Sequence, residues 1–138
     1  MKLRNVPTRA VTGVYILHTG WEKWHGDDER AAGVHAMAAN AFPVFSSMTA
    51  PAFLRTLSVG ELAVGAALLA PFVPTAVAGA ALTGFSGALV AMYLRTDALH
   101  RPGSLWPTPQ GIAVSKDSWL LAIGLGLIAD GLASRRTP

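Results

Sequence analysis

Glu61 is the residue whose position in the sequence points most directly to chemistry. It lies ten residues after Pro51, in a segment that is otherwise mainly apolar. At about 1.5 Å of rise per residue, that places it about 15 Å along a helix beginning near Pro51. An ionisable side chain at such a depth in a bilayer is costly and normally faces the bundle interior with a partner. Glu61 is therefore either a proton-handling or ligand-binding carboxylate, or a structural one that is protonated or paired with Lys23, Arg95 or Lys116.

Other polar residues are expected near Glu61, because the ends of several predicted membrane segments meet on one side of the bundle. The residues gathered at this mouth are Tyr15, His18, Glu22, Lys23, Arg55, Glu61, Arg95, Lys116 and Asp117. A polar mouth beside an apolar slot suits a quinone, whose carbonyl oxygens need hydrogen-bond donors. The alternative is a solvated rim, because helix ends are polar in any membrane protein.

Five of these residues are candidates for contact with a quinone headgroup: Tyr15, His18, Lys23, Glu61 and Arg95. If the chain is itself catalytic, the candidate residues are Glu61, Lys23 and His18. His18 and Glu22 are four residues apart, so they share a helix face and can form a hydrogen bond.

Several other cofactors are disfavoured by the residue types present. The chain has no cysteine, which removes disulfides, cysteine-ligated zinc, iron-sulfur clusters and covalently attached haem. A haem with two axial histidines would draw on His18, His25, His35 and His100, of which only His18 lies in a predicted span. The sequence therefore predicts no metal and no covalently bound cofactor, and a quinone is the cofactor that its residues favour.

The elements that position these residues follow from the distribution of charge. The chain is 51% hydrophobic and 14% charged, against about 25% charged in soluble domains. No Asp, Glu, Lys, Arg or His occurs at 62–94 or at 118–129, and one bilayer crossing needs about 20 mainly apolar residues. We predict an all-α integral membrane protein, a single membrane domain over 1–138. Its bundle of four transmembrane helices is expected at about 8–24, 52–70, 75–94 and 117–133.

Prolines and polar stretches divide these helices. Pro71 and Pro74 remove backbone donors, which is tolerated most easily at a membrane boundary, so they predict a tight helical hairpin. The alanine-rich stretch 31–42 is too short and polar to cross, and it predicts a short interfacial helix between the first two membrane helices. The proline-rich stretch 95–115 predicts a polar loop, with Ser115 as the N-cap of the last helix.

Small residues recur every four positions in the predicted helix 75–94. Ala80, Gly84 and Ala88 share one face, and the next face carries Gly79, Thr83, Gly87 and Ala91. Such spacing lets helix backbones approach closely in lipid, which predicts a central place in the bundle and a means of association with another helix. The alternative is that glycine and alanine are simply common throughout this chain.

Lys and Arg flank the apolar segments singly, so the net charge of +3 reflects topology and predicts no nucleic-acid partner. Four crossings would place both termini, with Lys2, Arg4, Arg9, Arg135 and Arg136, on one side, against six basic residues on the other. That count does not decide the orientation. The uncharged turn and the short basic termini favour cytoplasmic termini.

We expect no cleaved signal peptide and a multi-pass protein of the inner (plasma) membrane, in contact with lipid and with a protein partner or a second copy.

The arrangement resembles the DoxX family of small bacterial four-helix membrane proteins. The residues that carry the resemblance are His18, Gly20 and Lys23, Phe42-Pro43, Gly60-Glu61-Leu62 with Gly65, the proline turn, and Lys116-Asp117. It implies a membrane subunit of a redox system, since some members belong to thiosulfate:quinone oxidoreductase. The family's helix-one lysine and helix-two glutamate would correspond to Lys23 and Glu61. The long proline-rich loop and the absence of cysteine depart from the family and put sulfur chemistry by the chain's own side chains in doubt.

Two functional hypotheses follow, with a third behind them. The first is an accessory or anchor subunit of a redox or respiratory system that contacts quinone but holds no redox centre. The second is a catalytic, quinone-reactive oxidoreductase subunit with its site at Glu61, Lys23 and His18. The third is a small transporter.

Overall fold

The computed structural model describes residues 1–136, and this part of the chain is helical without a β-strand. The elements in chain order are η1 Leu3–Asn5, α1 Val6–Trp24, α2 Asp28–Ala41, η2 Pro43–Ser47, α3 Ala50–Leu69, α4 Thr75–Arg95, η3 Asp97–Leu99, α5 Ile112–Ser115 and α6 Asp117–Arg136. The four predicted segments correspond to α1, α3, α4 and α6, and the predicted short helix is α2.

Three helices are long and apolar enough to cross a membrane: Ala50–Leu69, Thr75–Arg95 and the continuous stretch Ile112–Arg135. The all-helical class is thus confirmed, with three candidate membrane-spanning helices where the sequence predicted four. Helix α1, with 19 residues, is not among them; it contains Arg9, Glu22 and Lys23 together with polar residues such as His18 and Thr19.

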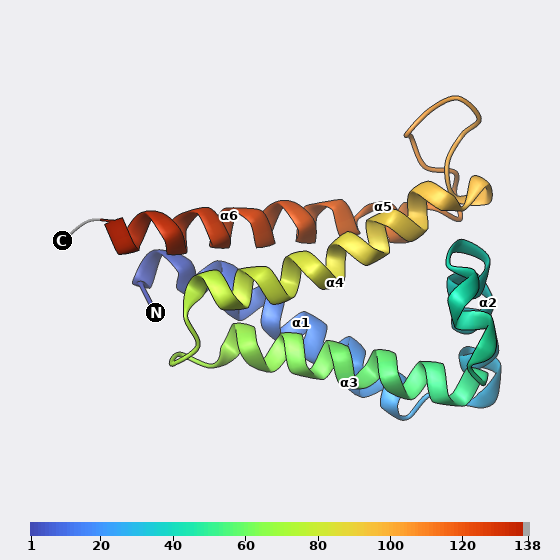
Figure 1. Cartoon of the computed structure of the whole chain (residues 1–138), viewed down its shortest axis with the longest axis horizontal. Helices are drawn as coiled ribbons and strands as arrows, with labels where there is room; N and C mark the ends of the chain where they lie inside the picture. Colours follow the sequence, from blue (N-terminus) through green and yellow to red (C-terminus); the bar gives the residue numbers. More distant parts are fainter. Residues whose placement is uncertain (137–138) are drawn as a thin grey trace.

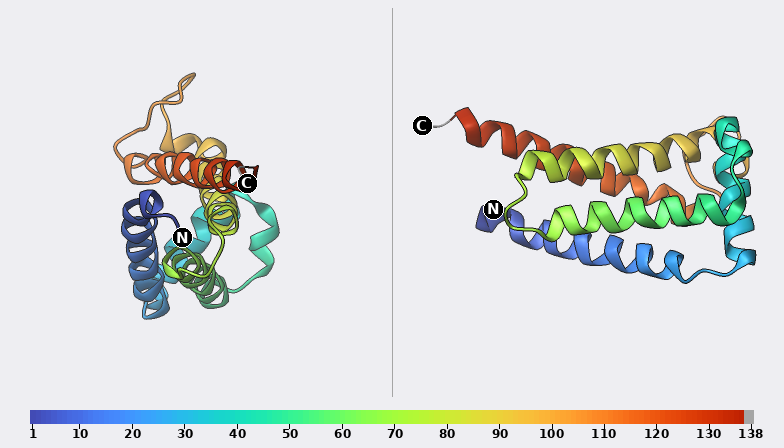
Figure 2. Two further views of the ribbon diagram at one scale, coloured as in Figure 1. Left: turned by 90° about the vertical axis from the view of Figure 1, so that its left-hand side faces the viewer. Right: turned by 60° about the horizontal axis from the view of Figure 1, so that its bottom comes forward.

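The long helices form two antiparallel pairs, α1 with α3 and α4 with α6 (Figure 1). The pairs lie close together at the end that holds both termini and the α3–α4 turn, and they diverge toward the other end (Figures 1 and 2). Helix α2 lies across that wide end, where it contacts both α3 and α4. The molecule is therefore a wedge whose open end is spanned by a short helix.

Glycines set the close approach inside each pair. A Cβ added to Gly65 of α3 would lie 2.9 Å from the Leu17 backbone nitrogen of α1. A Cβ added to Gly79 of α4 would lie 2.8 Å from the Gly124 carbonyl oxygen of α6. Both contacts are with backbone atoms, so side chains cannot move aside to relieve them. Each pair is therefore held at a spacing that only glycine permits at these positions.

Of the two small-residue faces expected on α4, one contacts another helix of the chain. Gly79 meets α6, and Thr83 lies against Gly124 of that helix. Ala80, Gly84 and Ala88, by contrast, are exposed, and a Cβ on Gly84 would meet nothing within 4 Å. The buried core lies toward the narrow end and joins all four long helices through Ile16, Leu68, Ala78, Leu82 and Leu127.

Arg9 is fully buried at the narrow end, although it was counted among the basic residues of the termini. Its guanidinium donates to the carbonyl oxygens of Leu68 at 2.8 Å, Ala67 at 2.9 Å, Ala70 at 3.0 Å and Val73 at 3.1 Å. These carbonyls belong to the last turn of α3 and the turn that follows, where the helix leaves acceptors unpaired and its dipole favours a cation. Arg9 therefore fixes the α3–α4 turn to α1 and is not a surface charge that reports topology.

Side-chain capping explains the start of α2 and of α3. Asp27 accepts the Arg30 backbone N–H at 2.8 Å and begins α2, and Thr49 accepts the Ala52 N–H at 3.3 Å at the start of α3. The expectation that Ser115 caps the last helix is wrong. Ser115 is the last residue of α5, and its hydroxyl donates back to the Ile112 carbonyl at 2.8 Å.

Replacing Arg9 with Met should lower stability by about 2 to 4 kcal/mol, because it leaves several buried carbonyls without a donor. Thermal unfolding of the purified protein in mild detergent, followed by tryptophan fluorescence, measures the loss. Arg101→Met, an exposed loop position, is the matched control and should unfold at the wild-type temperature. Equal stability of the two variants would show that the α3–α4 turn holds without Arg9.

Gly79→Val should also destabilise the protein, by about 2 kcal/mol or more, because its methyl groups would force α4 away from α6. Gly84→Val carries the same β-branched side chain on the same helix but points into open space. The same unfolding assay should therefore separate the two variants, with Gly84→Val close to wild type.

Candidate functional site

A cavity of about 790 Å³ lies between the two helix pairs at the wide end of the wedge. Its wall includes residues from α1, α2, η2, α3, α4, α5 and α6, so it is a feature of the whole fold. Most of the wall is apolar, with the aromatic rings of Phe42, Phe45, Phe53 and Phe85 among its members. Its size falls within the roughly 300–1,000 Å³ typical of small-molecule sites.

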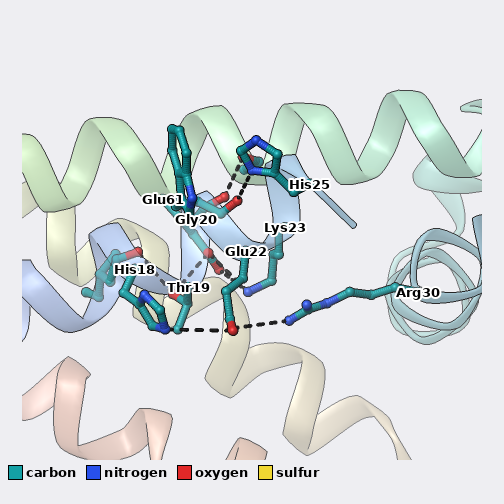
Figure 3. Close-up of polar contacts among 11 residues, drawn as sticks. His18, Thr19, Gly20, Glu22, Lys23, His25, Arg30 and Glu61 are labelled. Atoms are coloured by element: carbon teal, nitrogen blue, oxygen red, sulfur yellow. Dashed lines mark hydrogen bonds and ion pairs between the residues drawn. The ribbon is translucent and has the colours of Figure 1, made fainter. Parts of the chain in front are cut away.

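An ion pair forms the most polar part of this wall (Figure 3). The Lys23 ammonium of α1 lies 3.0 Å from each carboxylate oxygen of Glu61 on α3. The Thr19 hydroxyl lies 3.2 Å from the same carboxylate and 3.0 Å from the Ile16 carbonyl. The Lys23 and Glu61 side chains are only 17% and 5% exposed, so both charges are largely removed from solvent.

Close packing of α1 on α3 places these charges together. A Cβ on Gly20 would lie 3.0 Å from the Glu61 Cβ and 3.1 Å from the Leu62 nitrogen. The buried Ser58 hydroxyl donates to the Gly20 carbonyl at 2.7 Å and fixes the same register. Of the three partners considered for Glu61, the structure selects Lys23.

Both members of the pair also line the cavity, which is of ligand size. A lysine ammonium has three N–H donors, and two are directed at the Glu61 oxygens. The third is available to a group in the cavity. Glu61 thus holds the Lys23 ammonium in a wall that is mainly apolar.

Further polar side chains reach the cavity, among them Tyr15, Asp117 and Arg30. Tyr15 of α1 lines it and is 67% exposed overall. Asp117, at the start of α6, also lines it and lies within electrostatic range of both Glu61 and Lys23. The wall thus combines two cations, two carboxylates and a phenol near the wide end.

His18 and Arg95, also predicted at a headgroup site, do not line the cavity. The His18 ring lies 3.7 Å from Glu22 in the expected i, i+4 pair, and both side chains face outward, 65% and 48% exposed. Arg95 lies 4.8 Å over the Phe42 ring and donates to the Ala41 carbonyl at 3.5 Å, where it supports the η2 segment. The predicted mouth therefore divides into an inner group at the cavity and an outer group at the rim.

Sequence reasoning missed the contribution of α2 and η2. Arg30, Met37, Phe45 and Met48 all line the cavity, and the His35 ring is hydrogen bonded to the Phe45 carbonyl at 2.7 Å. The signal present in the sequence was the cluster of phenylalanine and methionine between 37 and 53, which is more apolar than a solvated linker requires. Thr19 was missed as well, because a lone threonine in a helix carries no pattern.

Within residues 1–136, no cluster of three or more His, Asp or Glu side chains could hold a metal ion. Comparisons of the chain with protein-family models, with curated proteins and with solved structures found no match. The resemblance to the DoxX family therefore rests on the residues quoted for it, of which Lys23 and Glu61 are the pair at the cavity wall.

Breaking the Lys23–Glu61 pair from one side should cost about 3 kcal/mol of stability, because it leaves one buried charge unpaired. Lys23→Met and Glu61→Leu should each show this loss in thermal unfolding. The double variant should recover most of it, since replacing both partners with apolar residues is often neutral. Losses that simply add in the double variant would mean that the two charges do not stabilise each other. His18→Ala, which removes only an exposed pair, should change stability by less than about 0.5 kcal/mol.

Proposed function

We propose that this chain is an integral membrane accessory subunit of a redox or respiratory system, and that it binds a quinone between its two helix pairs. The observation that carries the proposal is the 790 Å³ apolar cavity with the Lys23–Glu61 pair in its wall. A quinone ring is flat and apolar with carbonyl oxygens at its edge, and it matches phenylalanine walls with one positioned ammonium donor.

Membrane insertion, on this proposal, involves α1 together with the three apolar helices. The charges of α1 that face inward are satisfied inside the molecule, Arg9 by carbonyls and Lys23 by Glu61. Trp21 and Trp24 lie at its last turn, where amphipathic rings suit the interface between water and lipid. The proposed location is the inner (plasma) membrane with cytoplasmic termini, and the DoxX family is the proposed relationship.

The catalytic alternative is favoured by one observation, the presence of Asp117 near the Lys23–Glu61 pair. A second carboxylate beside a paired lysine could accept or deliver protons when a quinone is oxidised or reduced. In that case Glu61→Gln abolishes quinone-linked turnover of the assembled complex while assembly continues. If turnover survives this substitution, the catalytic alternative is excluded and the accessory role remains.

The binding proposal is tested with the full chain in lipid nanodiscs and a benzoquinone that carries one isoprenoid unit. Wild type should bind it. The Lys23→Met/Glu61→Leu double variant should lose about tenfold or more in affinity, which is the effect expected from losing a charge-assisted hydrogen bond. His18→Ala is the matched control and should bind like wild type, because His18 lies outside the cavity. Titration calorimetry measures the affinities.

Two results would contradict the proposal directly. One is wild-type protein that does not bind the quinone at all. The other is purified protein that carries stoichiometric haem, flavin or metal, which would make it a redox centre in its own right. Identification of the proteins that co-purify from membranes in mild detergent tests the accessory role separately.

A further inference from the structure

The cavity is large enough for a ring with a short side chain but not for a long lipid tail. Its 790 Å³ is filled by a ligand of drug size. A membrane quinone has a polyisoprenoid tail many units long, so most of that tail has to lie outside the cavity while the ring is bound. The tail therefore needs a path through the wall, and this reasoning rests on the proposed function.

Small residues interrupt the otherwise bulky lining that α3 and α4 give to the cavity. Where α3 and α4 diverge from their turn (Figure 1), the cavity is lined by Thr56 and Gly60 on α3 and by Ala88 on α4. All three are exposed, and a Cβ on Gly60 would meet nothing within 4 Å. The residues of α1 and α6 that line the cavity include the charged Lys23 and Asp117, whereas those of α4 are all uncharged.

The ends of the wedge are less suitable for an apolar chain. The narrow end is filled by the core around Leu68, Leu82 and Leu127. The wide end is spanned by α2, which begins with the exposed charged residues Asp28 and Glu29. Helices α3 and α4 are both apolar enough to lie in lipid, so an opening between them leads directly into the hydrocarbon layer.

We propose that the cavity is entered sideways from the bilayer, between α3 and α4 past Gly60 and Ala88, and that its occupant is a long-tailed lipid whose ring lies at Lys23 and whose tail leaves through this opening. Gly60 is then a residue that determines tail specificity. It admits the chain by lacking a side chain and takes no part in holding the ring.

The experiment compares two benzoquinones with the same ring, one with a single isoprenoid unit and one with a tail of eight or more units. Gly60→Leu and Ala88→Leu narrow the opening from its two edges. Gly126→Leu on α6 is the matched control, because Gly126 is exposed, has open space at its Cβ and does not line the cavity. Binding is measured in nanodiscs, and thermal unfolding checks that each variant folds.

Each opening variant should weaken binding of the long-tailed quinone by about tenfold or more and change binding of the short-tailed one by less than about threefold. The control should bind both as wild type does. An equal loss of both ligands, or no loss of either, overturns the lateral path while the quinone proposal stands. Wild type that binds the short-tailed quinone alone overturns it too. Failure of wild type to bind either quinone removes the proposed function itself.

Discussion

The buried guanidinium of Arg9 fixes the α3–α4 turn, which connects the two helix pairs, to α1. Arg9 extends from α1 and donates hydrogen bonds to carbonyl oxygens in the last turn of α3 and to that of Val73, which lies just before α4 begins. Because the surroundings are apolar, no water is present to donate to these carbonyls in place of the guanidinium. The narrow end of the wedge is thus fixed by hydrogen bonds as well as by its core, and the wide end is left to be closed by other means.

The packing of the helices also determines what surrounds the cavity. Within each pair the backbones are already in contact at Gly65 and Gly79, so the two helices of a pair cannot move closer to each other. The wide end is spanned by α2 and η2, held by the hydrogen bond between His35 and the Phe45 carbonyl and by Arg95 over Phe42. The cavity is thus bounded by two closely packed helix pairs and by a segment with its own hydrogen bonds across the wide end.

The sequence predicted the positions of the long helices well, because long uncharged runs and proline turns are local signals. It did not predict how Arg9 is used. Read along the chain, Arg9 is one more basic residue before an apolar segment, and its acceptors lie about sixty residues later. The sequence singled out Glu61 but left three possible ion-pair partners for it. Lys23 is selected by the register between α1 and α3, which Gly20 and Ser58 determine. The docking of α2 over the cavity depends on tertiary contacts that no periodicity encodes.

The burial of Lys23 and Glu61 favours a role beyond packing. Taking two charges out of water costs several kcal/mol per ion, which their attraction barely offsets, and apolar residues of similar volume would hold α1 to α3 at least as well. Gly13, Gly20 and Gly65 already bring those helices into contact, so the pair is not needed to join them. What apolar residues cannot provide is an ammonium group held at one point of an apolar wall. On the proposed function, this ammonium is the group that a ring with carbonyl oxygens needs as its hydrogen-bond donor.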